Sequence, residues 1–172
     1  MPHQVLISRQ EIEQRIRILA REIREKIDDG TPVAVLLLLN GALMFGSDLL
    51  RELPAHFIVD TLRVSSYGME TTSSGQVKWG DNWPDFTGKK VLVVDDVLDT
   101  GHTLQAVCNK LREKGALQVY TAVAVDKKGQ RQVDCDADFV GFTAGHEFLV
   151  GYGMDYAEKY RNLPYIAVLT GE

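Results

Sequence analysis

The chain has 172 residues, 45% of them hydrophobic and 25% charged, and its formal net charge is −5. This length suits one domain with a single core, and the acidic balance disfavours a polyanionic partner such as nucleic acid. Cys108 and Cys135 lie too far apart for a metal-binding motif, the N-terminus lacks a signal-peptide pattern, and the longest apolar run, Val33–Leu39, is too short to cross a bilayer. We therefore expect one cytoplasmic domain with reduced thiols and no membrane segment.

The first predicted element is an amphipathic helix over residues 8–29. Its apolar residues recur at helical spacing and would form one buried stripe: Ile12, Ile16, Leu19, Ile23 and Ile27. Ser8 and Glu11 match a capping box at the start, and Gly30 suits the end. This helix is expected to contribute packing and no chemistry.

A buried strand and a second helix follow. After the Thr31-Pro32 break, the continuous apolar run Val33–Leu39 predicts a strand covered on both faces. Asn40-Gly41 ends this strand, and residues 42–53 are predicted to be helical up to Pro54. Because Asn and Gly both tolerate unusual φ angles, this turn fits an ordinary strand–helix connection and a ligand-facing loop equally well.

A strand over residues 57–67 precedes a long polar segment. Residues 68–83 are rich in Gly, Ser and Thr, and they are too polar to build a core and too long for a simple hairpin. Loops of this length are usually functional lids or flexible surface segments. We favour a lid that closes over a site and excludes water.

The most informative stretch is Val91–Leu104. Its apolar run Val91–Val94 predicts a central parallel strand, which ends at Asp95 and Asp96 because carboxylates are costly to bury without partners. These acids are therefore expected in a short loop at the carboxyl end of the strand. Open α/β sheets bind their ligands at that end.

A phosphate site is predicted directly after the acids. Thr100 is a favoured N-cap for the apolar-periodic helix that follows, Gly101 permits close approach of the backbone, and free N–H groups at a helix start bind anions. The upstream carboxylates would repel a phosphate, but they would accept hydrogen bonds from a diol. A sugar phosphate, accompanied by a divalent cation, satisfies both requirements.

The later elements are less regular. Strands are predicted over residues 118–125, 139–142 and 165–169, and the first of them delivers Asp126-Lys127-Lys128 to the same carboxyl edge. Strands and helices alternate early, and the order becomes irregular late. This pattern indicates a mostly parallel α/β core with a small subdomain made from the two ends of the chain.

The central stretch resembles the phosphoribosyl-diphosphate signature of type I phosphoribosyltransferases: a strand, paired acids, two apolar residues and Asp-Thr-Gly-x-Thr. The resemblance extends from Leu36 to Leu169. The blocks Phe148–Tyr156 and Arg161–Tyr165 are similar to the hypoxanthine-guanine branch of this family.

This resemblance implies the type I phosphoribosyltransferase fold, an α/β fold with a mostly parallel central sheet flanked by helices and a small hood. Residues 1–172 would form a single phosphoribosyltransferase domain. The core would cover about 30–145, the lid loop about 68–83, and the hood would come from the N-terminal and C-terminal segments.

The resemblance also implies an activity. The enzyme would transfer the 5-phosphoribosyl group from phosphoribosyl diphosphate to N9 of a 6-oxopurine base, hypoxanthine or guanine, with Mg²⁺ as cofactor. The products would be IMP or GMP and diphosphate. The family suggests a homodimer or homotetramer, and the choice among hypoxanthine, guanine and xanthine is left open.

Matching positions receive roles from the resemblance. Asp99 would be the general acid/base near N7 of the purine. Asp95 and Asp96 would hold the ribose hydroxyls directly or through metal, and Asp155 would join them as a metal ligand. The 5′-phosphate would bind the backbone N–H groups of four successive residues, with hydroxyls added and the His102 ring exposed: Thr100, Gly101, His102 and Thr103.

Other loops would hold the base and the diphosphate. Lys127 would donate a hydrogen bond to the 6-oxo group of the base. Adenine carries an amino group at this position, which cannot accept this bond and would be repelled by the ammonium group. Phe148 would stack on the purine ring, and Leu149 would offer backbone groups to its edge. The diphosphate would contact residues from three parts of the chain: Asn40, Gly41, Ser66, Tyr67 and Arg161.

Plainer explanations compete with these roles. Lys127 fits a solvated loop residue, Phe148 fits a core residue, and Asp155 fits the N-cap of a helix predicted over 156–161. Considered singly, Asp155 is best explained as a helix cap and Arg161 as a surface residue. Considered together, the spacing of these residues matches the family and favours their roles in binding the substrate.

One alternative belongs to a different functional class. A nucleotide sensor could keep the phosphoribosyltransferase fold and bind RNA or DNA. The net charge of −5 argues against this hypothesis, and salt-dependent binding of nucleic acid would support it.

Overall fold

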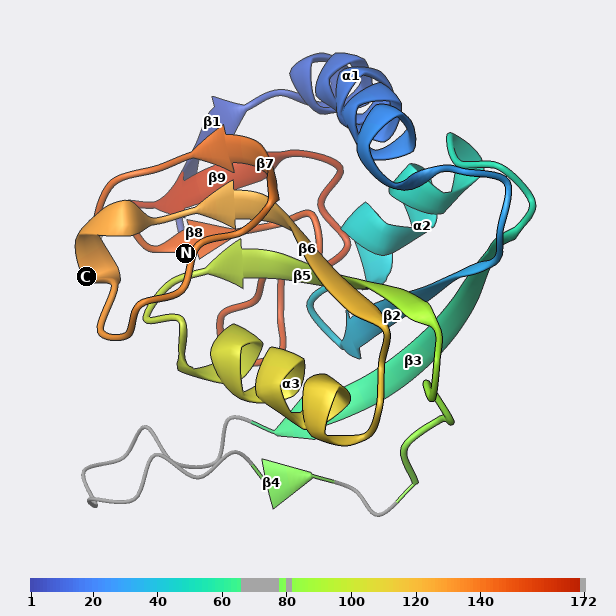
Figure 1. Cartoon of the computed structure of the whole chain (residues 1–172). Coiled ribbons are helices and arrows are strands. Elements are labelled where there is room, and N and C mark those ends of the chain that lie inside the picture. The colour runs from blue at the N-terminus through green and yellow to red at the C-terminus, as the bar shows by residue number, and fades with distance from the viewer. Residues whose placement is uncertain (66–77, 80–81, 171–172) are drawn as a thin grey trace.

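The computed structural model describes residues 1–65, 78–79 and 82–170. Within these ranges the chain forms a six-stranded sheet with helices on both faces and a separate three-stranded sheet (Figure 1). Most of the lid expected at 68–83 falls on residues 66–77 and 80–81, which lie outside the described residues.

The larger sheet has the order β4-β3-β2-β5-β6-β7, and in the described residues five of its strands are parallel, with β4 antiparallel to β3. The strands are β2 (Val33–Leu39), β3 (Phe57–Ser65), β4 (Lys78–Trp79), β5 (Lys90–Leu98), β6 (Gln118–Asp126) and β7 (Phe139–Thr143). Their apolar runs suit strands that are covered on both faces. The strand order reverses between β2 and β5, which makes this position the topological switch point of the sheet.

Three helices sandwich the larger sheet in the described part of the chain. Helices α1 (Arg9–Ile27) and α2 (Leu43–Arg51) cover one face, and α3 (His102–Glu113) covers the other (Figure 1). A short 3₁₀ turn, η1 (Lys128–Gln130), follows β6. Among these described helices, none combines the length and the apolar character that a membrane span requires.

The two faces of the sheet are packed by alternate residues of each strand. Val35 and Leu37 of β2 belong to the apolar cluster that includes α1 and α2, whereas Leu36 and Leu38 belong to the cluster that includes α3. All four side chains are buried. Burial of each such side chain contributes about 1.5–3 kcal/mol, so these residues of β2 stabilise the packing on both faces of the sheet.

Helix α1 confirms the predicted capping box and apolar stripe. Glu11 N donates to Ser8 Oγ at 3.2 Å, and Ser8 N donates to Glu11 Oε2 at 2.8 Å. The half-buried side chain of Arg15 donates to the carbonyl oxygens of Gly141 at 2.8 Å and Val140 at 2.7 Å. These bonds tie α1 to β7.

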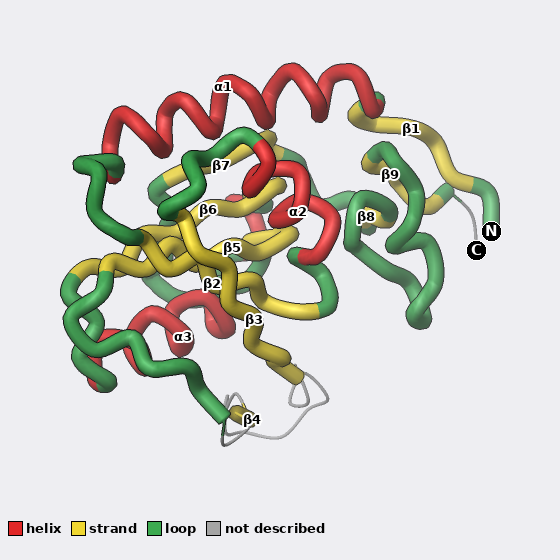
Figure 2. Tube along the Cα trace, turned by 90° about the vertical axis from the view of Figure 1, so that its right-hand side faces the viewer, coloured by secondary structure: helices red, strands yellow, loops and turns green. Residues whose placement is uncertain are grey.

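The two ends of the chain meet in the smaller sheet. Its strands are antiparallel, in the order β1 (His3–Ile7), β9 (Ile166–Leu169) and β8 (Leu149–Val150). Thr170 N donates to Pro2 O at 3.0 Å just beyond the β1–β9 pair. Figure 2 shows this sheet beside the larger one, with the N-terminal and C-terminal segments adjacent.

The helix predicted over 156–161 is wrong. Ala157, Glu158 and Tyr160 have φ angles of 50°, 63° and 78°, which a right-handed helix excludes. The Asp155 carboxylate accepts a hydrogen bond from Glu158 N at 2.9 Å, and this local bond stabilises a turn instead.

Candidate active site

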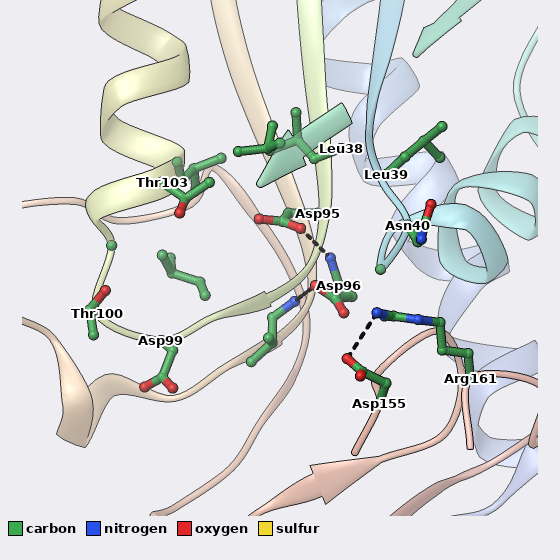
Figure 3. Close-up of a pocket in the computed structure, with 16 residues that line it drawn as sticks. Leu38, Leu39, Asn40, Asp95, Asp96, Asp99, Thr100, Thr103, Asp155 and Arg161 are labelled. Carbon is green, nitrogen blue, oxygen red and sulfur yellow. Dashed lines mark hydrogen bonds and ion pairs between the residues drawn. The ribbon is translucent and has the colours of Figure 1, made fainter. Parts of the chain in front are cut away.

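A cavity of about 270 Å³ lies at the switch point, where β2 and β5 end (Figure 3). Its described lining combines apolar residues with ten other residues from the end of β5, the start of α3 and three loops: Asn40, Gly41, Asp95, Asp96, Asp99, Thr100, Gly101, Thr103, Asp155 and Arg161. Each of these ten residues is predicted from the sequence and the family resemblance to contact the substrate or a metal. The structure brings them together around one space.

Asp95 and Asp96 lie inside β5, so the predicted acidic loop is wrong. Strand β5 continues to Leu98 because Asp95, Val97 and Leu98 still pair with β6. Local backbone donors make this possible: Asp96 N donates to Asp95 Oδ1 at 2.9 Å, and Val97 N donates to Asp96 Oδ1 at 2.8 Å. Each carboxylate thereby gains a partner that the sequence pattern does not reveal.

The environment of these acids disfavours their ionised forms. Burial raises the pKa of both carboxyl groups, and the neighbouring Asp96 charge raises the pKa of Asp95 further. Local hydrogen bonds and the Arg161 charge offset part of the rise in the Asp96 pKa. Repelling carboxylates at the rim of a cavity favour a ligand that brings hydrogen-bond donors or a cation.

A tight loop connects β5 to α3. Gly101 is the N-cap of α3, and the prediction of Thr100 for this position is wrong. Gly101 has a φ angle of 90°, a left-handed conformation that glycine adopts without steric cost. Thr100 Oγ1 lies 3.5 Å from the amide nitrogen of His102. The helix start therefore presents backbone N–H groups and the positive end of the helix dipole beside the cavity.

Asp99 occupies the junction between β5 and this loop. Its carboxylate lines the cavity, and its Oδ1 atom is buried with no hydrogen-bond partner within the described ranges. A buried acceptor without a partner costs about 1–3 kcal/mol. This oxygen is available to accept a hydrogen bond from a ligand bound in the cavity.

The His102 ring lies outside the lining of the cavity. Its side chain is exposed, and Nε2 lies 3.1 Å from Gln132 Oε1. The exposed ring agrees with the prediction, in which this residue contacts the phosphate only through its backbone amide at the start of α3.

Two glycines shape the opposite wall. A Cβ atom at Gly41 would overlap the Asp96 carboxylate. A Cβ atom at Gly153, whose φ angle is 99°, would overlap the carbonyl oxygen of Gly41. Asn40 Oδ1 lies 3.4 Å from Arg63 Nη2 beside this contact. Glycine is therefore required at both positions for the loops to approach so closely.

Asp155 and Arg161 face the cavity from the turn that leads out of β8. Arg161 Nη2 lies 3.0 Å from Asp155 Oδ1 (Figure 3). Arg161 Nη1 donates to Gly153 O at 2.8 Å, and Nε is buried without a partner in the described part of the chain. This turn replaces the predicted helix, so Asp155 is not a helix N-cap.

The donor set suits Mg²⁺ only in combination with a substrate. No group of three or more His, Cys, Asp or Glu side chains among the described residues is arranged to hold a metal. Mg²⁺ commonly binds one or two protein carboxylates together with phosphate oxygens and water. Asp95, Asp96 and Asp155 offer such oxygen donors around the same cavity.

The residues predicted to bind the purine lie apart from this lining as far as the chain is described. Lys127 follows β6, is 8% exposed, and donates its backbone N–H to Leu98 O at 2.9 Å. Phe148 is 53% exposed, so the alternative that it is a core residue is wrong. Its ring contacts the Tyr156 ring edge-on, with the two ring centroids 5.7 Å apart. Leu149 is buried in β8. Ser66 and Tyr67 lie outside the described residues.

Arg131 was not predicted from the sequence. Its guanidinium lies behind the Asp99–Gly101 loop and contacts Asp126, which is 1% exposed. The stretch around it is polar and irregular, so only the fold reveals that it contacts the loop. Gly153 was missed too, although two closely spaced glycines, Gly151 and Gly153, were a visible signal for a special backbone conformation.

Residues 6–157 match the family model described as the phosphoribosyl transferase domain. The chain belongs to the phosphoribosyltransferase family.

Within that family, the chain is similar to proteins named hypoxanthine-guanine phosphoribosyltransferase. It is 41% identical over 166 residues to the hypoxanthine-guanine phosphoribosyltransferase of Bacillus subtilis, covering 96% of this chain and 92% of that one. A crystal structure of a hypoxanthine-guanine phosphoribosyltransferase from Bacillus anthracis superposes with a TM-score of 0.90 at 36% identity, covering 97% of this chain and 98% of that one.

A third kind of relative is larger. The chain is 42% identical over 169 residues to the bifunctional protein TilS/HprT of Listeria monocytogenes, which covers 98% of this chain. It spans about a quarter of the length of that relative, 26%.

Proposed function

We propose that this protein is a purine-salvage enzyme that transfers the 5-phosphoribosyl group from phosphoribosyl diphosphate to N9 of hypoxanthine or guanine. The products are IMP or GMP and diphosphate. The observation that carries the proposal is the single cavity lined by the acid pair, the loop at the start of α3 and the Asp155–Arg161 pair. The names of the relatives supply the choice of a 6-oxopurine as the acceptor.

The ribose 5-phosphate end binds along β5 and α3. The backbone N–H groups and hydroxyls of residues 100–103 hold the phosphate, as the helix start favours. Asp95 and Asp96 accept hydrogen bonds from the ribose hydroxyls. The few local donors that these carboxylates engage leave acceptor capacity for a diol.

Asp99 is the general acid/base at N7 of the purine. As N9 forms its bond to C1′, the imidazole part of a base protonated at N7 gains positive charge, and the Asp99 carboxylate accepts the N7 proton, which leaves a neutral purine. The buried Oδ1 atom without a partner in the described residues supports this role.

The diphosphate leaves toward Asn40, Gly41 and Arg161. Negative charge builds on the departing group, and the Arg161 guanidinium stabilises it with charge-assisted hydrogen bonds. Asp95, Asp96 and Asp155 would hold Mg²⁺ together with substrate oxygens, and the bound ion would offset the diphosphate charge. Ser66 and Tyr67 are included in this subsite on the family resemblance alone.

The base lies between Lys127 and Phe148. The Lys127 ammonium donates to the 6-oxo group, Phe148 stacks on the ring, and Leu149 contributes backbone groups. The exposure of Phe148 supports a ligand-facing role, because a large exposed aromatic ring is available for stacking.

We also propose the arrangement of the whole protein. The core covers about 30–145, the terminal segments form the hood, and residues 68–83 act as a lid that excludes water from the activated sugar. The assembly is a homodimer or homotetramer in the cytoplasm. The nucleic-acid-binding alternative gains no support, since four carboxylates and one guanidinium are the charged groups of the described lining.

The test is product formation from phosphoribosyl diphosphate, Mg²⁺ and each of hypoxanthine, guanine, xanthine and adenine. We expect turnover with hypoxanthine or guanine and none with adenine. A folded sample that converts none of the 6-oxopurines would refute the proposal.

A further inference from the structure

Three successive carbonyl groups at the end of β5 are held by one segment. Leu98 O, Asp99 O and Thr100 O all accept hydrogen bonds from residues 127–132. The donors are, in that order, Lys127 N at 2.9 Å, Arg131 Nε at 3.2 Å and Gln132 N at 2.9 Å. Arg131 supplies the one side-chain donor in this described set.

These bonds fix the direction of the neighbouring amide groups. In a trans peptide the C=O of one residue is antiparallel to the N–H of the next. With Asp99 O and Thr100 O directed at residues 131–132, the N–H groups of Thr100 and Gly101 are directed the opposite way. Both residues also line the cavity.

Arg131 is itself rigidly held. Its side chain is 15% exposed, Nη2 pairs with the buried Asp126 carboxylate, and Nη1 donates to Cys135 O. The stem also packs on the loop, because a Cβ atom at Gly101 would lie 2.9 Å from Arg131 Cδ. A planar guanidinium can reach these separate acceptors at once, whereas an ammonium cannot.

We propose that Arg131 is a positioning residue for the phosphate-binding loop. By holding Asp99 O and packing against Gly101, it directs the amide N–H groups of Thr100 and Gly101 at the 5′-phosphate. Arg131 does not touch the ligand and acts through the backbone. The identity of the ligand as a ribose 5-phosphate rests on the proposed function.

Two variants that preserve local charge test this role. Arg131→Lys keeps the cation but loses the fork of donors. The double variant Asp126→Asn with Arg131→Gln removes a buried pair together, so no unpaired carboxylate is left to prevent folding. Thermal unfolding identifies the folded samples. Calorimetry then measures the affinity of the full chain for IMP, inosine and ribose 5-phosphate.

We expect the affinity for IMP and for ribose 5-phosphate to fall by about 10- to 100-fold in both variants, as for the loss of hydrogen bonds to a charged group. The affinity for inosine, which lacks the phosphate, stays at the wild-type value. A purely structural role would weaken nucleotide and nucleoside alike.

Arg15 provides the matched control. It also donates to two backbone carbonyls and to a carboxylate, Glu22, but it ties α1 to β7 away from the cavity. Arg15→Lys is expected to lower stability and to leave the ratio of IMP to inosine affinity unchanged. The proposal is overturned if the Arg131 variants keep the wild-type ratio, or if Arg15→Lys lowers it equally.

Failure of the proposed function gives a different result. A wild-type protein that binds ribose 5-phosphate but forms no nucleotide refutes the transferase, while the Arg131 effect on ribose 5-phosphate still decides the positioning role. A wild-type protein that binds neither phosphate ligand refutes both.

Discussion

At the scale of single residues, several groups in the site lower the stability of the folded protein. Burial raises the pKa of Asp95 and Asp96 inside a central strand, and Asp99 keeps a buried oxygen without a partner in the described residues. Each of these features opposes folding, and the apolar layers of β2 and α3 offset them. Their concentration at one cavity is what distinguishes this region from the rest of the surface.

Asp99→Asn tests the acid/base role. The amide keeps the size of the side chain but cannot accept a proton at neutral pH, so turnover is expected to fall by about 10²–10⁴-fold. The KM for phosphoribosyl diphosphate should change little, because the proposed ribose and phosphate contacts do not involve the Asp99 side chain. Steady-state kinetics measure both, and Asp134→Asn, at an exposed position, is the control. Wild-type turnover in Asp99→Asn would remove this role.

Gly41→Ala tests the close packing of the two walls. The added methyl group would overlap the Asp96 carboxylate, so either the loop or the acid must move. We expect the KM for phosphoribosyl diphosphate to rise by about tenfold or more, as for loss of a charged hydrogen bond. Gly145→Ala is the control, since its methyl group meets only the flexible end of Glu147. An unchanged KM in Gly41→Ala would show that this packing is not needed.

At the scale of elements, the spacing of apolar residues predicted helices and strands correctly where packing alone decides the structure. The stripe of α1 and the apolar runs of β2 and β5 appear in the fold as predicted. The predictions failed where polar side chains bond to nearby backbone. Asp95 and Asp96 stay inside β5 through such bonds, and Asp155 helps to hold a turn where a helix was expected. Spacing does not reveal these local bonds.

Ser8→Ala tests the start of α1. Loss of the N-cap hydroxyl is expected to lower the free energy of unfolding by about 1 kcal/mol. Urea unfolding measures the change. Glu11→Gln should cost less, because glutamine also completes a capping box. Neither variant should alter turnover, since α1 contributes no lining to the cavity in the described residues. Equal stability of Ser8→Ala and wild type would contradict the capping assignment.

At the scale of the whole molecule, the cavity depends on segments that follow both sheets. The turn after β8 carries Asp155 and Arg161, while the loop between β5 and α3 belongs to the larger sheet. Tyr152 OH donates to Asp48 Oδ2 at 2.8 Å and so links that turn to α2, which begins two residues after Gly41. Motifs in the sequence identify each piece. The sequence pattern indicates a subdomain made from the two ends of the chain, but the long-range strand pairing that builds it is not specified by any local pattern.

The stability of the whole molecule should fall at alkaline pH. Burial raises the pKa of the Cys108 thiol from 9.0 to about 12. Above pH 9 the unfolded chain therefore loses this proton while the folded chain keeps it, so unfolding becomes easier as the pH rises toward 12. Burial and the bond to Asp48 raise the pKa of Tyr152 as well, which adds to the loss above pH 10.

Urea unfolding between pH 7.5 and 10.5 measures this decline. The Cys108 contribution is about 1 kcal/mol per pH unit above pH 9. Cys108→Ala should be less stable at pH 7.5 but should lose less stability with rising pH. An identical slope for the variant and the wild type would show that the thiol is not the group responsible.

The central claim is that a backbone loop holds the phosphate while neighbouring acids hold the ribose. A crystal structure of the protein with IMP tests it most directly. We predict that the phosphate lies against the amide groups of residues 100–103, with the ribose hydroxyls on Asp95 and Asp96. A nucleotide bound elsewhere, or bound here with its phosphate directed away from this loop, would contradict the account.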